Sequence, residues 1–458
     1  MRGDSRGQGT LFPVSLDELV PEDHVCRVID AFVESLEMAE LGFGKARPAG
    51  TGRPPYDPAD LLKLYRYGYL HQVRSSRRLE RECQRNLELW WLLGRLAPDF
   101  KTIADFRRDN GAAIVASGRA FVVFCQGQGL LGQRLALDGT KIKSAGSRDR
   151  SFTAGQLAEE QQRLEAYLST LEQADAADTE APVRAERVRA ALTELAAAAQ
   201  VLSKEQRNTL CVSDPDAQLM RSGRAGIIAG YNLQASVDQR SGVVVHHAVT
   251  QQAGDNQQLL PMAAASQALL QAESLEVVAD AGYSNGAQLQ ACEDQGIQPL
   301  VAVNRAINNQ GNYFDKAHFA YDAERDVYRC PAGETLVHKT YSSKDKIHLY
   351  HREDCTGCAL KDRCTASGGR WVSRHFHEEA FERSRQRLAD DPDAMTRRMA
   401  TAEPVFGTLK RRMGEGGRCR CWGLGGVSSE IGLHVLAHNL QRVINLAGPR
   451  WLIGALAN

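Results

Sequence analysis

The chain has 458 residues, and its 56 basic and 56 acidic side chains give a formal net charge of zero. The length predicts about two to four domains, and the neutral charge argues against a uniformly cationic coat for nucleic acid. No stretch approaches the roughly 18 apolar residues of a membrane span, and Met1–Ser5 begin no apolar signal region. The 11 cysteines, an odd number, favour free thiols in a reducing cytoplasm.

Residues 1–125 have helical apolar spacing, interrupted by a Gly- and Pro-rich break from Gly42 to Pro58. Between Lys63 and Arg85 basic residues strongly outnumber acidic ones. Short helices with a basic side are typical of a helix-turn-helix-like DNA-binding module, although small helical bundles look similar. Solvated helix faces are the alternative explanation for the basic cluster. Its candidate DNA contacts are Arg74, Arg77 and Arg78.

Residues 126–154 begin a sheet region, in which an apolar strand over 131–143 carries Asp138. In residues 155–210 leucine and valine recur at helical spacing on both sides of a connector that contains Ala, Asp and Pro. This pattern predicts two long antiparallel helices inserted into the sheet domain. Because acids outnumber bases between Leu157 and Gln200, DNA is the weaker choice of partner for these helices, and a dimer surface is a candidate role.

Residues 211–304 return to an α/β pattern. The runs Ile227–Val237 and Val243–Thr250 flank a Gly-containing turn and predict a β-hairpin. Strands over 275–279 and 297–303, with helices before each, predict a parallel β–α–β segment. Asp280 follows the first of these strands in a context that matches Asp138, so we expect both carboxylates at the ends of neighbouring strands, where open sheets bind ligands.

Residues 305–390 contain a cysteine-rich island made of Cys330, Cys355, Cys358 and Cys364. A CxxC pair with glycine in its turn places two thiolates on one side of a knuckle, which indicates tetrahedral structural zinc. His348 or His351 could replace one sulfur, and a reduced thiol cluster or a redox pair is the alternative. The basic and aromatic residues around the island are typical of nucleic-acid contact.

Residues 391–458 are predicted to be helical and carry Glu403, with Lys410 two turns further along roughly the same face. Taken singly, a strand-end aspartate is more often a cap or turn former. Asp138, Asp280 and Glu403 at one point would repel one another unless cations lay between them. Two Mg²⁺ or Mn²⁺ ions are the usual answer, with Asp138 bridging both and the other two acids each holding one; such sites perform phosphoryl transfer on DNA or RNA.

Two further residues have competing interpretations. Asp255 is a fourth candidate acid, for which we favour a role as the N-cap of the helix that follows. Trp422 could stack on a flipped base near a cleaved end, and packing in the core is the alternative.

Together these segments resemble bacterial insertion-sequence transposases of the DDE class. Arg53–Pro58 and Arg74–Glu80 resemble the N-terminal domain of such enzymes, and Asp138–Lys141 and Ala279–Tyr283 resemble the two aspartate motifs. Glu403–Gly407 with Lys410 resembles the glutamate motif. The resemblance implies a ribonuclease H-like α/β core, a mixed sheet with helices on both faces, to which the all-α DNA-binding domain, the helical hairpin and the zinc insertion are attached.

The resemblance also implies a function. Such enzymes bind the terminal inverted repeats of their element as double-stranded DNA, cleave the ends and transfer them to a target, working at least as a dimer. Lys141, beside the first aspartate, becomes a candidate DNA contact. A DNA-binding regulator without catalysis and a metal-dependent nuclease that cuts without joining are the rival interpretations.

One departure concerns the residues before the glutamate, where relatives often carry Tyr-x2-Arg. Met395 occupies the tyrosine-like position here, and Arg398 precedes Glu403 by four intervening residues. Lys410 keeps the family spacing. We expect Arg398 and Lys410 to contact DNA phosphate, with solvated helix faces as the alternative. No residue of this sequence replaces the tyrosine in its role.

Overall fold

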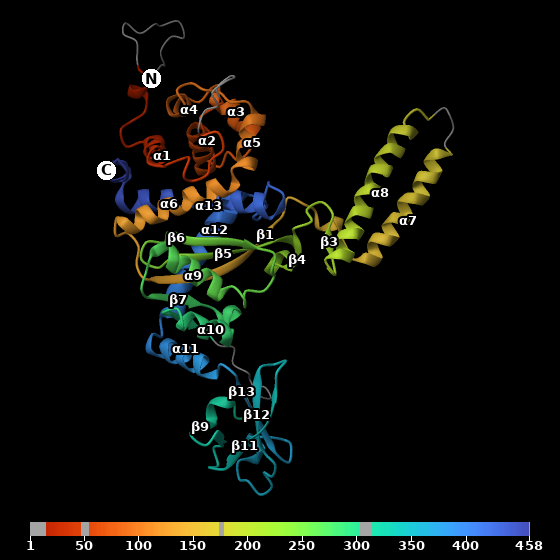
Figure 1. The fold of residues 1–458 in the computed structure, drawn as a ribbon, viewed down its shortest axis with the longest axis vertical. Coiled ribbons are helices and arrows are strands. Elements are labelled where there is room, and N and C mark those ends of the chain that lie inside the picture. The colour runs from red at the N-terminus through yellow and green to blue at the C-terminus, as the bar shows by residue number, and fades with distance from the viewer. Residues whose placement is uncertain (1–14, 47–54, 174–177, 303–312, 458) are drawn as a thin grey trace, which may run out of the picture. The chain divides into compact units, whose positions relative to one another are not determined.

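The computed structural model describes residues 15–46, 55–173, 178–302 and 313–457. The chain divides into two compact units. The first comprises residues 1–254, 268–272 and 399–458, and the second comprises residues 255–267 and 273–398. Figure 1 shows the elements of both units.

The first unit opens with the helical region expected from the sequence. Its elements are η1 (Asp17–Leu19), α1 (Val25–Glu34), α2 (Pro58–Leu70), α3 (Ser76–Cys83), α4 (Leu87–Leu92), α5 (Phe100–Asp109) and α6 (Gly111–Gly127). Side-chain caps start several of them. Asp57 accepts a hydrogen bond of 2.8 Å from the backbone N–H of Ala59, with Pro58 at the first helical position. Asp99 caps α5 by accepting from two backbone N–H groups.

A sheet built around one long strand forms the centre of this unit. Its strands are β1 (Arg134–Lys143), β4 (Gln218–Arg221), β5 (Ile227–Asp238) and β6 (Val244–Thr250). β5 pairs antiparallel with β1 along one edge and with β4 and β6 along the other. The predicted hairpin of β5 and β6 is confirmed.

Asp138 lies inside β1, opposite Ala235 of β5, so the expectation that it ends a strand was wrong. The polar residues after Asp138 continue the ladder with β5 as far as Lys143. Gly230 permits this close pairing, because a Cβ at that position would lie 2.0 Å from the carbonyl oxygen of Ile142. The residues before and after Asp138 both pair with β5, so the backbone that carries the Asp138 side chain is fixed.

The two long helices expected between the sheet strands are present as α7 (Ala154–Glu172) and α8 (Ala181–Lys204), which pack against each other. Thr153 and Gln156 form a reciprocal capping box at the start of α7. Leu157, Leu195 and Leu202 bury the base of the hairpin against the small pair β2 (Ser151–Phe152) and β3 (Leu210–Cys211). Figure 1 shows both helices extending away from the sheet of the same unit.

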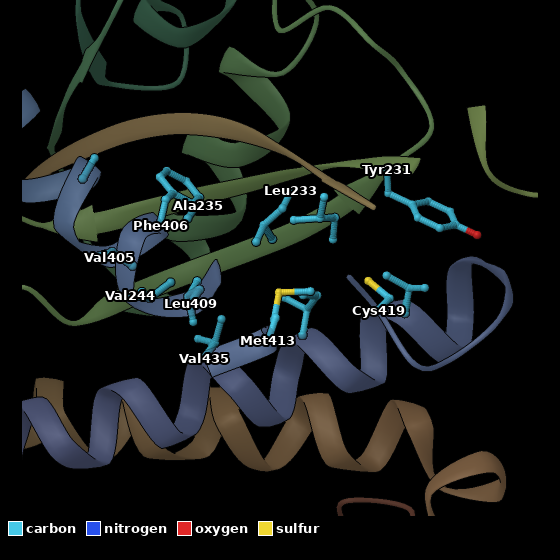
Figure 2. Packing of buried hydrophobic residues seen from close by; sticks show 14 of the residues in the cluster. Tyr231, Leu233, Ala235, Val244, Val405, Phe406, Leu409, Met413, Cys419 and Val435 are labelled. Atoms are coloured by element: carbon cyan, nitrogen blue, oxygen red, sulfur yellow. The ribbon is translucent and has the colours of Figure 1, made fainter. Parts of the chain in front are cut away.

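The C-terminal helices complete the first unit. They are α12 (Ala394–Met413), which enters this unit at Met399, α13 (Gly423–Ala447) and α14 (Pro449–Leu456). On α12, residues Val405, Phe406 and Leu409 recur at helical spacing and pack on Leu233 and Ala235 of β5 (Figure 2). Helix α13 is buried along much of its length because it contacts α2, α6 and β6.

The second unit contains two separate sheet elements. β7 (Leu275–Ala279) and β8 (Ile297–Val301) pair in parallel, which confirms that prediction, and α10 (Gly286–Glu293) and α11 (Glu378–Asp390) pack on β8. Most of α9 (Leu259–Leu270) belongs to the same unit. The other sheet is antiparallel, in the order β13-β12-β11-β10-β9. Its strands are β9 (Ala320–Asp322), β10 (Val327–Arg329), β11 (Thr335–Ser342), β12 (Ile347–Arg352) and β13 (Arg370–His375).

The fold class is therefore mixed α/β, as the sequence predicts. None of the described helices is long and apolar enough to cross a membrane.

The packing of α12 generates a stability prediction. Leu409 is 1% exposed in the core between α12 and β5, so Leu409→Ala leaves a cavity and is expected to lower the free energy of unfolding by about 2–5 kcal/mol in urea titrations. Leu446→Ala on α13 is the matched control, because Leu446 is 46% exposed, and it should change stability by less than about 0.5 kcal/mol. Equal effects of the two substitutions would contradict this packing.

A pH prediction follows from His434 of α13. Burial, together with the positive charges of Arg74, Arg412 and Arg107, lowers the pKa of this histidine well below 6.5, and its ring packs edge-on against Tyr69. Below pH 6.5 the unfolded chain takes up a proton that the folded chain refuses, so stability falls as the pH drops. Replacing the histidine removes this loss.

His434→Leu should therefore flatten the pH dependence of unfolding free energy between about pH 6.5 and 5 by up to about 1.4 kcal/mol per pH unit. Above pH 7.5 the curves of variant and wild type should run parallel, which serves as the internal control. An unchanged slope in the acid range would mean that His434 binds a proton in the folded protein.

Candidate active site and cysteine cluster

In the first unit, β1 and α12 bring an acid and two lysines into one electrostatic neighbourhood. Burial lowers the pKa of Lys410, the nearby charge of Asp138 raises it, and Lys141 lowers it, with a net decrease. Glu403 is exposed on α12 and shares a face with Lys410, two turns away. The Asp138 carboxylate accepts a hydrogen bond of 2.8 Å from the backbone N–H of Gly139. Of the predicted site residues, Asp138 therefore lies on β1, and Glu403 and Lys410 lie on α12.

A glycine-rich loop fixes the end of α12 against β1. The backbone N–H of Lys143 donates to Gly417 O at 2.9 Å, and the N–H of Cys419 donates to Lys143 O at 2.9 Å. Gly417 has a φ of +87° and lies against the stem of Lys410, where a Cβ would come within 3.0 Å of Cγ. The loop therefore limits where the Lys410 side chain can go.

Arg74 occupies a structural position that the sequence did not reveal. Its side chain is 9% exposed and forms an ion pair of 3.2 Å with Glu430, whose side chain is fully buried. It also donates to the carbonyl of Met413 at the end of α12. The second Glu430 oxygen accepts from the backbone N–H groups of Arg420 and Cys421 at 2.8 and 2.9 Å. The guanidinium expected to contact DNA is thus bound within the protein.

The start of α13 displays Trp422. Asp214 Oδ1 accepts from Gly423 N at 3.1 Å, and Asp216 Oδ2 accepts from Leu424 N at 2.8 Å, so two acids from a distant loop cap the helix. The Trp422 ring is 56% exposed, and the interpretation of Trp422 as a core residue was wrong. The Asp214-Pro215-Asp216 sequence signals a cap, but not which helix it serves.

In the second unit, Asp280 directly follows β7 and is the N-cap of a short 3-10 helix. Its Oδ1 accepts from Gly282 N at 2.9 Å, and its Oδ2 accepts from Arg398 Nη2 at 3.0 Å. The Asp280 side chain is 44% exposed, whereas that of Arg398 is 5% exposed. Arg398 is therefore a buried partner of an expected catalytic acid, and a contact with DNA phosphate would require this ion pair to open.

Asp255 does not cap α9. That helix begins at Leu259, so Asp255 precedes the N-cap position, and the expected role was wrong. Asp255 instead lies beside the Asp280 turn: a Cβ on Gly282 would be 2.9 Å from Asp280 Oδ1 and 3.8 Å from Asp255 Oδ2. Asp255 lies in the segment between β6 and α9, so this connection sets its position.

The four cysteines of the island surround one cavity of about 240 Å³ in the second unit. Two turns present three of them: Gly333 N donates to Cys330 O at 2.8 Å, and Cys358 N donates to Cys355 O at 3.3 Å. Burial raises the pKa of Cys355 and of Cys364, and the charges of neighbouring thiolates add to the effect. The four predicted cysteines therefore line the same cavity.

The two histidines that could replace a sulfur do not line this cavity. His351 stacks on Trp371 with ring centroids 3.9 Å apart, and His348 packs against Phe376. Among the described residues, no group of three or more His, Cys, Asp or Glu side chains stands ready to hold a metal ion.

The remaining candidates are on the surface or outside the described chain. Arg77 and Arg78 on α3 are exposed, and Arg77 lies over the ring of Phe100. Arg53 and Pro54 of the N-terminal motif, the Met1–Ser5 segment and the 304/305 boundary of the cysteine-rich insertion lie outside the described residues.

Two family models match the chain. Residues 14–109 match a transposase domain (DUF772), and residues 329–444, which include Glu403 and Lys410, match a transposase DDE domain. No curated protein matches. A cryo-EM structure of a piggyBac transposase synaptic complex with hairpin DNA covers 95% of this chain and 84% of its own, at 8% identity and a TM-score of 0.26, which is too low to support an argument.

Both matched regions are transposase domains. The matches support an insertion-sequence transposase of the DDE class.

Proposed function

We propose that this protein is an active DNA transposase, which binds the terminal inverted repeats of an insertion sequence, cleaves its ends and transfers them to target DNA. The observation that carries the proposal is that the charge of Asp138 on β1 acts on Lys410, which lies on the helix of Glu403, inside a chain with a DDE domain. In this proposal Asp138, Asp280 and Glu403 are the catalytic acids, and the catalytic core is ribonuclease H-like.

The acidic side chains suit a site for two Mg²⁺ or Mn²⁺ ions. Asp138, Asp280 and Glu403 supply carboxylate oxygens, the donors that these hard cations prefer, and Asp280 and Glu403 are accessible from solvent. Asp138 would bridge the ions, and the other two acids would each hold one. When bound, the ions supply charge neutralisation at the phosphate and activation of the attacking oxygen.

The protein's own groups position the carboxylates and the DNA. Gly282 N and Arg398 hold both oxygens of Asp280, which restricts its rotation before the DNA arrives. Lys410 carries a positive charge beside Asp138, and we assign it to a phosphate near the scissile bond. Trp422 is exposed for stacking on an unpaired base, and Arg77, Arg78 and Lys141 are proposed contacts with the duplex.

The proposal includes assembly. Two element ends must be processed in one complex, so the working form is a homodimer or a higher oligomer, acting in the cytoplasm on double-stranded DNA. The α7–α8 hairpin is a candidate dimer surface, because acidic residues outnumber basic ones between Leu157 and Gln200, which disfavours DNA. A silent regulator would bind the repeats without cutting them, and a nuclease would cut without joining.

Catalysis is tested by measuring cleavage and joining of DNA that carries the repeats flanking the gene. Wild-type protein with Mg²⁺ should give 3′-OH ends at the repeat boundary and joined products. Asp280→Asn and Glu403→Gln should each lower the yield of cleaved ends and of joined products by at least about 100-fold. The loss of a metal ligand should reduce activity at least as much as the loss of a group that supports a ligand, which costs up to about 100-fold. Ends and joined products are mapped by sequencing.

The matched control is Glu353→Gln, because Glu353 is an exposed carboxylate that directly follows β12 and forms an ion pair with Lys339. It should leave cleavage unchanged. Tight binding without cleavage by the wild type would favour the regulator, and cleavage without joined products would favour the nuclease.

For the cysteine cluster we propose a structural zinc ion bound by Cys330, Cys355, Cys358 and Cys364. The support is the kind of donor and its location: four sulfurs line one cavity, and glycines with positive φ, Gly333 at 84° and Gly357 at 78°, shape the two turns that present them. Four thiolates leave no open coordination position, so this site would stabilise the small sheet and take no part in chemistry. A reduced thiol cluster is the rival interpretation.

Metal analysis of the purified protein tests this site. We expect about one zinc ion per chain in the wild type, lost in Cys355→Ser and Cys358→Ser, with a lower melting temperature after chelation. Cys292→Ser is the control, because Cys292 is a buried thiol of α10 outside the cluster. Zinc-free wild-type protein from zinc-supplemented medium, with a melting temperature that chelators leave unchanged, would show a thiol cluster instead.

A further inference from the structure

A second cavity, of about 510 Å³, lies in the first unit between α12, α13 and the β5–β6 turn. Its lining is basic and polar: it includes Arg411, Arg412, Arg442, His438, Gln441 and Asn445, and no acidic side chain of the described residues. A concave surface that gathers arginines without carboxylates attracts anions.

The wall formed by the β5–β6 turn is held in place by α13. Arg442 Nε donates to the carbonyl of Ser241, and the His438 ring contacts Gly242 O at 3.2 Å. Gly242 has a φ of +72°, and a Cβ there would lie 2.9 Å from Arg442 Nε. This close approach sets the position of the Arg442 guanidinium before any ligand binds.

The opposite wall, on α12, contains Arg412, whose guanidinium has a hydrogen-bond donor that the described residues leave unsatisfied. Arg412 Nη1 is buried and has no hydrogen-bond partner among the described residues. Burial lowers the pKa of Arg412, and the adjacent charge of Arg411 lowers it further, with no acid opposing them. An anion in the cavity would satisfy Nη1 and relieve the repulsion between the two guanidinium groups.

We propose that this cavity binds a phosphate of the DNA backbone, an inference that rests on the proposed function. The basic wall and Glu403 belong to one helix, so Arg411 lies roughly 12 Å along the axis from Glu403. Successive phosphates of one strand are spaced about 3.4 Å along a duplex. A duplex whose scissile bond lies at Glu403 therefore has phosphates within reach of the cavity, where one of them would help to align the strand on α12.

The test measures affinity for a duplex carrying the terminal repeat as a function of salt concentration. Arg412→Gln and Arg411→Gln should each reduce the slope of log K against log salt by about 1 and weaken binding at about 0.1 M salt roughly tenfold. Cleavage at saturating DNA should persist. Arg450→Gln on α14 is the matched control, because Arg450 is 73% exposed and does not line the cavity.

The outcomes separate the two proposals. A wild type that does not bind the duplex overturns the proposed function itself. A wild type that binds and cleaves, with slopes for both cavity variants equal to that of Arg450→Gln, overturns the cavity assignment alone. If Arg412→Gln melts at a lower temperature than the control, then Arg411→Gln decides the result, because Arg411 is exposed and its loss leaves no buried gap.

Discussion

The packing of α12 on β5 is the constraint on which the rest of the first unit depends. Val405, Phe406 and Leu409 fix the rotation of the helix, because an apolar stripe can face the sheet in only one orientation. That orientation places Lys410 near Asp138 and leaves Arg411 and Arg412 on the cavity side. One rotational setting thus serves two surfaces, and a shift of one residue, about 100°, would displace both.

The buried pair of Arg74 and Glu430 secures this setting from the far end. A buried ion pair costs desolvation and contributes little net stability unless its remaining hydrogen-bonding groups are satisfied. Here the Glu430 carboxylate also accepts from two backbone N–H groups, and Arg74 donates to the last turn of α12. The pair therefore joins the N-terminal helices, the end of α12 and α13 at one point, and removal of either partner would leave an uncompensated buried charge.

Periodicity and turn chemistry were sufficient for the elements that local sequence determines: the β5–β6 hairpin, the α7–α8 pair and the parallel β7–β8 pair. Long-range partners were not predictable. Asp138 lies within its strand because β5 supplies a partner beyond the apolar run, and Arg398 is buried because Asp280, far away in sequence, receives it. The turn between Cys355 and Cys358 is local and can be predicted from the CxxC spacing, whereas caps such as Asp214 on α13 connect segments about two hundred residues apart.

The buried ion pairs and hydrogen bonds also reduce the positive charge that this neutral chain can offer to DNA. Three arginines bind partners inside the protein. Arg66 donates to a hydroxyl and a carbonyl, Arg74 forms an ion pair with Glu430, and Arg398 forms one with Asp280. Basic residues that cluster in the sequence therefore do not form one cationic face, and the count of arginines overstates the charge available to DNA. The sites proposed for a polyanion are local: they include exposed Arg77 and Arg78 on α3, Lys141, Lys410 and the cavity beside α12. Local basic sites on a neutral protein favour binding at defined phosphates over indiscriminate coating of the duplex, because few counterions are released elsewhere.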